Sequence, residues 1–234
     1  MSRRVEIVED ILSANDRLAS ENRAWLDAVG VFAVNLMASP GAGKTSLIER
    51  IIAALGRELR VAVIDGDLAT SLDADRAAAA GAQAVQINTA GQCHLDAAMV
   101  RRGLEALDLT RVDLLLVENV GNLVCPAAFD LGTQARVLVA SVPEGDDKPY
   151  KYPGSYRGLD VVLLNKVDLL PYVPFDVARF LRGVEMLNPS LRSYRISCVT
   201  GEGLDEWLAW LRQAVAARRG APRTASEAAG AGRR

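Results

Sequence analysis

Residues 38–45 of this chain read Ala38-Ser39-Pro40-Gly41-Ala42-Gly43-Lys44-Thr45. The stretch follows the apolar run 31–37 and precedes residues 44–56, in which apolar side chains recur at helical spacing. A strand, a glycine-rich turn and a helix in this order are typical of a phosphate-binding P-loop. Ala38 replaces the first glycine of the usual pattern, at a position that opens the turn and does not face the phosphates. The segment predicts a P-loop NTPase.

The residue types of this loop suit the phosphates of a nucleotide. Glycine lets backbone N–H groups turn toward phosphate oxygens, and the N-terminus of the following helix adds partial positive charge. The Lys44 amine can reach the β- and γ-phosphates and stabilise charge during phosphoryl transfer, and the Thr45 hydroxyl can bind Mg²⁺. We expect nucleotide contacts from the consecutive residues Gly41, Ala42, Gly43, Lys44, Thr45 and Ser46.

Composition and charge narrow the class of protein. The chain has 234 residues, half of them hydrophobic, which suits one α/β domain with appended ends. Its formal net charge of −2 gives no reason to expect nucleic-acid binding, and no apolar run approaches membrane-spanning length. Arg3-Arg4 is followed by acidic residues without an apolar core, so we expect no export signal. Three cysteines without such a signal indicate a reducing compartment, and we expect a cytoplasmic protein.

Strand-like and helix-like segments alternate along most of the chain. We predict strands near residues 31–38, 61–66, 83–88, 113–118, 136–142, 160–165 and 193–197. We predict helices over residues 4–28, 44–56, 72–80, 94–107, 174–187 and 204–216. The continuous apolar runs 61–65, 114–117 and 161–164 are typical of parallel strands that are buried on both faces. The expected fold is a mostly parallel, doubly wound sheet of about seven strands with flanking helices, which binds ligands at the carboxyl ends of its strands.

The base is predicted from Asn165-Lys166-Val167-Asp168, which follows an apolar strand. This matches the guanine-recognition pattern N-K-x-D. In that pattern the Asp168 carboxylate accepts hydrogen bonds from guanine N1–H and from the exocyclic amine. Adenine lacks that pair of donors. Lys166 is expected over the base, and Asn165 is expected to tie loops together. Ser197 and Cys198 follow the last strand, where a further GTPase motif lies in related proteins, or they are structural fillers.

Magnesium and the γ-phosphate require ligands from strands beside the P-loop. Asp67 ends the second predicted strand, and we expect it to share Mg²⁺ with Thr45 and to act in catalysis. The segment Glu118-Asn119-Val120-Gly121 ends the fourth strand and resembles a D-x-x-G switch in which glutamate replaces aspartate. Glu118 is a further catalytic candidate there, and the Gly121 N–H is expected to meet the γ-phosphate.

Two alternatives remain open at these strand ends. Asp65 can be either a structural or a catalytic carboxylate. The chain also places no glutamine where Ras-like proteins orient the attacking water. We therefore expect GTP hydrolysis to GDP and phosphate that is slow without a partner or dimerisation.

Cys93, His94 and Cys125 form a candidate metal site. Cys93-His94 follows the third predicted strand, and Cys125 follows the fourth, so all three are expected at the nucleotide-facing edge of the sheet. Two thiolates and one imidazole suit Zn²⁺ or Ni²⁺. Asp96, water or a second subunit can complete such a site. The alternative is two buried cysteines and a histidine that caps a helix, which the spacing alone favours.

These motifs together resemble the hydrogenase-maturation nickel-insertion GTPase family of the HypB type. The resemblance covers roughly residues 4–216. It rests on segments that include Gly66-Asp67-Leu68-Ala69-Thr70-Ser71-Leu72, Glu144-Gly145-Asp146-Asp147-Lys148-Pro149 and Asn165-Lys166-Val167-Asp168-Leu169-Leu170-Pro171-Tyr172. Two further segments exceed generic GTPase signatures, namely Cys93-His94-Leu95-Asp96 and Asn122-Leu123-Val124-Cys125-Pro126.

The resemblance implies a GTPase that helps to deliver Ni²⁺ to the large-subunit precursor of nickel–iron hydrogenase. It implies a homodimer promoted by GTP, a HypA-type accessory partner, and metal ligation by Cys93, His94 and Cys125. Many relatives carry an N-terminal Cys-x-x-Cys-Gly-Cys motif or a histidine-rich stretch, and some have a second histidine where Ala98 stands here. Neither motif is present in this sequence, so we expect no nickel storage through them.

We expect three parts: an N-terminal helical extension at 1–30, a P-loop GTPase domain with an embedded metal site at 31–217, and a disordered tail at 218–234. The apolar segment 169–173 is expected either at a dimer face or under the following helix. Other functions stay open, namely a urease-type or other nickel-delivery GTPase, or a metal-binding module whose nucleotide site is only structural.

Overall fold

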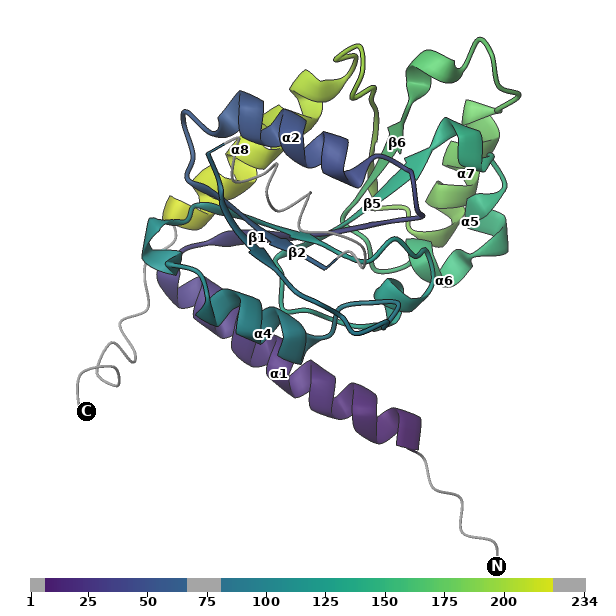
Figure 1. Cartoon of the computed structure of the whole chain (residues 1–234). Coiled ribbons are helices and arrows are strands. Elements are labelled where there is room, and N and C mark those ends of the chain that lie inside the picture. Colours follow the sequence, from purple (N-terminus) through teal and green to yellow (C-terminus); the bar gives the residue numbers. More distant parts are fainter. Residues whose placement is uncertain (1–6, 67–80, 221–234) are drawn as a thin grey trace, which may run out of the picture.

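The computed structural model describes residues 7–66 and 81–220, and within these residues seven strands form one parallel sheet (Figure 1). The strands are β1 Phe32–Ala38, β2 Val61–Asp65, β3 Gln83–Gln86, β4 Leu114–Glu118, β5 Ala135–Ser141, β6 Val161–Asn165 and β7 Arg192–Arg195. They pair in the order β3-β2-β4-β1-β5-β6-β7. All pairings are parallel, which confirms the expected P-loop α/β fold.

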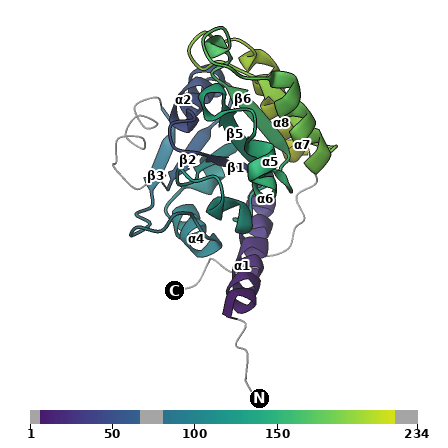
Figure 2. The ribbon, with the colours of Figure 1, turned by 90° about the vertical axis from the view of Figure 1, so that its right-hand side faces the viewer.

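Helices cover both faces of this sheet (Figures 1 and 2). They are α1 Ile7–Val29, α2 Lys44–Leu55, α4 Ala97–Glu105, α5 Lys148–Lys151, α6 Pro153–Tyr156, α7 Val177–Leu187 and α8 Leu204–Gly220. Short 3-10 turns span η1 Leu109–Arg111, η2 Cys125–Ala128, η3 Val142–Glu144 and η4 Val167–Leu169. Helices α2 and α8 pack on one face, and α1, α4 and α7 pack on the other. Among the described helices, none has both the length and the apolar character that a membrane span requires.

Alternating side chains along the strands build the two halves of the core. In β4, Leu114 and Leu116 are buried toward α2, while Leu115 and Val117 are buried toward α1 and α4. Because every residue of β4 is buried, this strand carries apolar side chains on both faces. The continuous apolar runs of the sequence thus correspond to the central strands of the sheet.

Most predicted boundaries lie within a few residues of the observed ones, and the exceptions have local causes. Helix α4 begins at Ala97 because the Asp96 carboxylate caps it, accepting from the Met99 N–H at 2.7 Å. Helices α5 and α6 were not expected. Helix α8 continues through Gly220, so residues 218–220, expected in a disordered tail, are helical. The helix expected at 72–80 lies outside the described residues.

The end of α8 meets the C-terminal end of α1 at the edge of the sheet opposite the P-loop. The buried Asp113 carboxylate precedes β4 and accepts from Arg60 Nη2 at 2.6 Å and from the Arg60 backbone N–H at 2.8 Å. Arg219 of α8 forms an ion pair with the same carboxylate, and Arg218 pairs with Asp27 of α1. These contacts hold the end of α8 against the sheet and against α1.

Replacing Asp113 tests this junction. The hydrogen bonds from Arg60, and then those from Arg219, hold the pKa of Asp113 well below its usual range against the opposing effect of burial. A lowered carboxyl pKa contributes stability above the unfolded-state pKa of about 3.9, and this stability is lost as the pH falls toward the folded-state value. Asp113→Asn should lower the free energy of unfolding at pH 7 by about 1.5–3 kcal/mol.

Urea titrations at neutral and acidic pH measure this effect. The gap between the original protein and Asp113→Asn should narrow as the pH drops below about 4. Asp16→Asn, an exposed change on α1, is the control and should leave the free energy of unfolding nearly unchanged. A gap that stays constant with pH would show that the charge of Asp113 does not stabilise the fold.

Candidate nucleotide site and metal centre

The P-loop connects β1 to α2 through two glycines with left-handed backbone angles. Gly41 has φ 73° and Gly43 has φ 102°. A Cβ atom on Gly43 would lie 2.5 Å from Nδ2 of Asn165, so both backbone angle and space require glycine here. Lys44 opens α2 and is only 6% exposed. The loop therefore places a buried lysine and the N-terminus of a helix at one point, as phosphate binding requires.

A cavity of about 520 Å³ opens beside this loop. Its lining includes the predicted residues Gly41, Gly43, Lys44, Thr45, Ser46, Glu118, Gly121 and Lys166. Ala42 is buried and is not part of this lining. Asn165, Asp168, Ser197 and Cys198 are predicted site residues that are not part of this lining. The structure thus gathers eight of the expected residues around one polar cavity.

The end of β4 lies against the P-loop. The Thr45 hydroxyl donates to Oε1 of Glu118 at 3.0 Å, and Glu118 is only 2% exposed. A Cβ atom on Gly121 would lie 3.3 Å from Cα of Pro40, so the segment 118–121 and the P-loop are in close contact. A hydroxyl and a carboxylate at this separation are oxygen ligands of the kind that Mg²⁺ prefers.

Of the two other acidic candidates, Asp65 lies within the described residues and Asp67 lies outside them. Asp65 is 1% exposed and lies opposite Glu118 in the register of β2 with β4, while its backbone carbonyl accepts from the N–H of Ile87 at 2.7 Å. Asp67, expected to hold Mg²⁺ and to act in catalysis, lies outside the described residues. Its assignment stays a prediction.

The predicted base-recognition loop is connected directly to the P-loop. Asn165 is buried at the end of β6, and its Nδ2 donates to the carbonyl of Ala42 at 2.9 Å. Its Oδ1 accepts from the Cys198 N–H at 3.2 Å. Lys166, with φ 63°, donates from Nζ to the carbonyl of Gly41 at 2.7 Å. Asn165 thus connects the P-loop with the loop after β7. This agrees with the expectation that Asn165 ties loops together.

Ser197 and Cys198 take different parts in this arrangement. The Ser197 hydroxyl donates to Oδ1 of Asp168 at 2.5 Å and accepts from the N–H groups of Val199 and Thr200. These contacts fix the Asp168 carboxylate at the rim of the loop. Burial raises the pKa of the Cys198 thiol to about 11. Cys198 therefore contributes its backbone N–H, while its side chain packs in the core.

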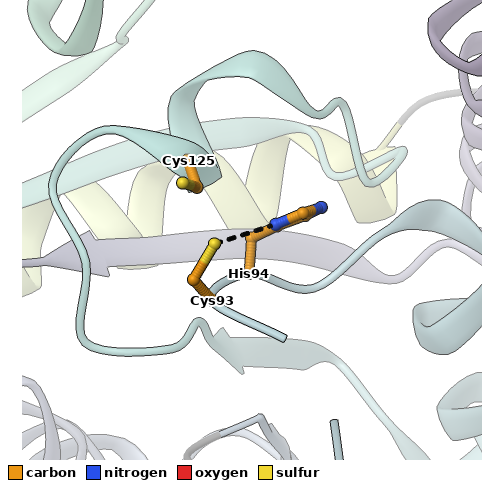
Figure 3. Close-up of side chains that lie close together, drawn as sticks. All are labelled: Cys93, His94 and Cys125. Carbon is orange, nitrogen blue, oxygen red and sulfur yellow. Dashed lines mark hydrogen bonds between the residues drawn. The ribbon is translucent and has the colours of Figure 1, made fainter. Parts of the chain in front are cut away.

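Cys93, His94 and Cys125 come together as predicted (Figure 3). Their candidate ligand atoms all lie within 4.8 Å of one another, and Sγ of Cys93 lies 3.6 Å from Nδ1 of His94. Cys93 and His94 belong to the segment before α4, and Cys125 opens η2. Cys93 is exposed and Cys125 is partly exposed, so the alternative of two buried cysteines does not describe these two residues.

Local interactions orient this cluster and set its protonation. The His94 ring stacks on Phe129, with centroids 3.9 Å apart and an angle of 24° between the planes. Burial lowers the pKa of His94, against an opposing effect of Asp96, so burial favours the neutral imidazole that metals bind. The neighbouring Cys125, together with desolvation, raises the pKa of the Cys93 thiol. Asp96 caps α4 and lies outside the three-residue cluster.

Asn119 joins the nucleotide cavity to this cluster, and the sequence analysis did not single it out. Its side chain is fully buried directly after Glu118. Oδ1 accepts from the N–H of Leu95, the residue after His94, at 3.0 Å, and Nδ2 donates to Oδ1 of Asn35 in β1 at 3.1 Å. A polar residue at the end of an apolar strand is the signal that could have identified it.

Comparison with known proteins identifies the family of the chain. The CobW/HypB/UreG nucleotide-binding domain matches residues 32–195. A hydrogenase maturation factor HypB from Azotobacter chroococcum is 51% identical over 93% of this chain and 71% of its own length. The crystal structure of HypB from Archaeoglobus fulgidus has a TM-score of 0.82 at 41% identity, over 87% of this chain and all of that one.

A nickel-bound relative is also similar. The structure of HypB from Helicobacter pylori in complex with nickel has a TM-score of 0.83 at 34% identity, over 87% of this chain and 96% of that one. These matches confirm the resemblance that the sequence motifs indicated. The chain therefore belongs to the CobW/HypB/UreG nucleotide-binding family and, within it, to the HypB-type hydrogenase maturation factors.

Proposed function

We propose that this protein hydrolyses GTP to GDP and phosphate and uses this cycle to deliver Ni²⁺ to the large-subunit precursor of a nickel–iron hydrogenase. One observation carries the proposal: the buried side chain of Asn119, which directly follows Glu118 of the nucleotide cavity, accepts from the N–H of Leu95 beside the Cys93/His94/Cys125 cluster. A change beside the γ-phosphate at Glu118 is thereby passed to the backbone next to His94. The site can thus couple the state of the nucleotide to the affinity for the metal.

The lining of the cavity supports phosphoryl transfer from GTP. Lys44 and Gly121 both line the cavity. Lys44 stabilises charge on the transferring phosphoryl group, and the Gly121 N–H contacts that group. Thr45 and Glu118 would hold Mg²⁺, together with Asp67 as predicted; this ion would supply positive charge to the phosphate oxygens. Water is the nucleophile, and hydrolysis is slow in the isolated protein.

Guanine selectivity is assigned to Asp168. Its Oδ1 accepts from the Ser197 hydroxyl, which holds the carboxylate in one orientation, while both oxygens keep lone pairs that can accept from a base. Lys166 and Asn165 fix the same loop to the P-loop. The distance between the groups that contact the base and those that contact the phosphates is therefore fixed. Such a rigid carboxylate accepts from guanine and has no matching donors in adenine.

Exchanging this carboxylate for an amide tests the assignment. Asp168→Asn should weaken GDP binding by at least about 100-fold. The change replaces one carboxylate oxygen, which accepts from guanine, by an amide NH₂ group, which can only donate. It should favour xanthosine diphosphate, whose C2 carbonyl accepts from that amide. Titration with fluorescent analogues of both nucleotides measures the preference.

A phosphate-site variant provides the control for this titration. Lys44→Ala should weaken both diphosphates alike and abolish phosphate release from GTP, since Lys44 serves the phosphates and not the base. An unchanged preference for GDP over xanthosine diphosphate in Asp168→Asn would exclude Asp168 as the residue that reads the base.

The metal cargo is assigned to Cys93, His94 and Cys125. Two sulfurs and one imidazole nitrogen match the donors that Ni²⁺ and Zn²⁺ accept, and three protein ligands leave positions for water or a receiving protein. The cluster is open to solvent at Cys93, as release of a cargo ion requires. The similarity to a HypB structure in complex with nickel supports Ni²⁺ as the cargo.

Removing one sulfur tests this cluster. Cys125→Ser should weaken Ni²⁺ binding, measured by competition with a chromophoric chelator, by about 10-fold or more, because one of three ligands is lost. Cys198→Ser is the matched control, since that thiol is buried in the core and lies outside the cluster. Equal Ni²⁺ affinities of Cys125→Ser and Cys198→Ser would remove the metal assignment.

The remaining assignments concern partners and location. We assign a homodimer promoted by GTP, a HypA-type accessory partner and a cytoplasmic location, without nucleic-acid or membrane partners. In the segment 169–173, Tyr172 is 81% exposed, while Leu169, Leu170 and Val173 are partly buried against the core. The exposed Tyr172 ring next to the base-recognition loop supports a dimer contact that senses the nucleotide.

A further inference from the structure

We propose that helix α1 is a positioning element of the metal centre, because its side chains hold together the two segments that carry the candidate ligands. The first segment runs from Cys93 to Ala97, and the second runs from Cys125 to Thr133. This inference rests on the metal site assigned above and deepens it. Its basis is a set of hydrogen bonds from α1 to the backbones of both segments.

Asn22 bridges the two segments with a single amide group. Its side chain is fully buried, and Nδ2 donates to the carbonyl of Ala97 at 2.9 Å and to the carbonyl of Leu131 at 3.2 Å. The two amide hydrogens are thus donated to two different segments. Ala97 lies three residues after His94, so this bond acts close to the imidazole.

Asn15 forms a second bridge two turns earlier on α1. Its Oδ1 accepts from the N–H of Ala97 at 2.9 Å, and its Nδ2 donates to the carbonyl of Asp130 at 2.9 Å. Asn15 and Asn22 together satisfy both backbone groups of Ala97. Residues seven positions apart lie on one face of a helix, so both amides belong to one polar stripe of α1.

The second segment has two more attachments to the same helix. Nη2 of Arg23 donates to both carboxylate oxygens of Asp130, at 3.0 and 2.8 Å. Gly132 has φ 84°, and a Cβ atom there would lie 2.3 Å from the carbonyl oxygen of Ala19 in α1. Only glycine permits this approach, so the segment lies directly on the helix.

These attachments lie one step from the metal ligands. Asp130 follows Phe129, whose ring stacks on His94 from the other segment. The fixed backbone of Asp130 therefore sets where Phe129 meets the imidazole, and the fixed backbone of Ala97 sets where the imidazole lies. Ligands held in place before metal binding lose less conformational freedom on binding, which strengthens affinity. Helix α1 thereby sets the metal affinity without supplying a ligand.

Two substitutions test this role in the full chain. Asn22→Leu removes both bridging bonds at similar side-chain volume. Asn15→Asp keeps the acceptor for Ala97 and loses the donor to Asp130. Each variant should weaken Ni²⁺ binding by about 10-fold, as measured by chelator competition, and should change the thiolate-to-nickel absorption band. GDP affinity should change less than about twofold, since neither residue touches the nucleotide cavity.

Asn188→Leu is the matched control. Asn188 also donates from Nδ2 to a backbone carbonyl, that of Leu159 at 2.9 Å, but it joins α7 to the segment before β6. This variant should lose thermal stability and keep its Ni²⁺ affinity. The inference is overturned if Asn22→Leu and Asn15→Asp bind Ni²⁺ like the original protein, or lose no more affinity than Asn188→Leu.

A metal-free measurement separates this inference from the proposed function. Diamide, which takes up two hydrogens as it oxidises two thiols, should link Cys93 to Cys125 in the apo-protein, followed by mass spectrometry. Loss of the bridge should slow this linkage in Asn22→Leu relative to Asn188→Leu, and equal rates would overturn the inference. If the original protein binds no nickel through Cys93 and Cys125, the proposed function is overturned, whichever rates of disulfide formation are found.

Discussion

All seven strands of the described sheet run parallel, and this constraint brings the loops after β1, β4 and β6 to one edge. The P-loop, the base-recognition loop and the segment after β4 therefore share that edge, although more than 120 residues separate the first from the second. The cysteine segments follow β3 and β4 and reach the same edge. Strand direction brings Cys93-His94 to the nucleotide edge, and Cys125 reaches it four residues after Gly121 in the segment that follows β4.

Buried asparagine side chains join the segments at this edge of the sheet through hydrogen bonds. Asn119 connects β1, the end of β4 and the backbone beside His94, and Asn165 connects the P-loop with the loop after β7. A buried amide that loses its partners costs about 1–3 kcal/mol, so such residues resist independent movement of the segments they join. Asn22 adds the same kind of connection from α1. Three asparagines thus link a glycine-rich loop, a base-recognition loop and a metal cluster into one unit.

The sequence predicted the parts of the structure that depend on local pattern. Continuous apolar runs identified the central strands, and the spacing of Gly41, Gly43 and Lys44 identified the P-loop. The Cys93/His94/Cys125 cluster was predicted from strand ends and from family resemblance. What the sequence did not predict depends on long-range contacts: the Asn15 and Asn22 bridges, the stack of Phe129 on His94 and the junction of Asp113 with α8. Asparagine in a helix has no local signal for a partner 75 or 115 residues away. The start of α4 was also displaced, because Asp96 caps the helix and leaves Cys93-His94 in an extended segment.

We propose that the nucleotide state and the metal affinity are coupled through this shared edge. This coupling is measured as the affinity of the full chain for Ni²⁺, by chelator competition, with saturating GDP and then with a non-hydrolysable GTP analogue. We expect the two affinities to differ by at least about fivefold, at the lower end of typical coupling between sites. Equal affinities in the two nucleotide states would contradict it.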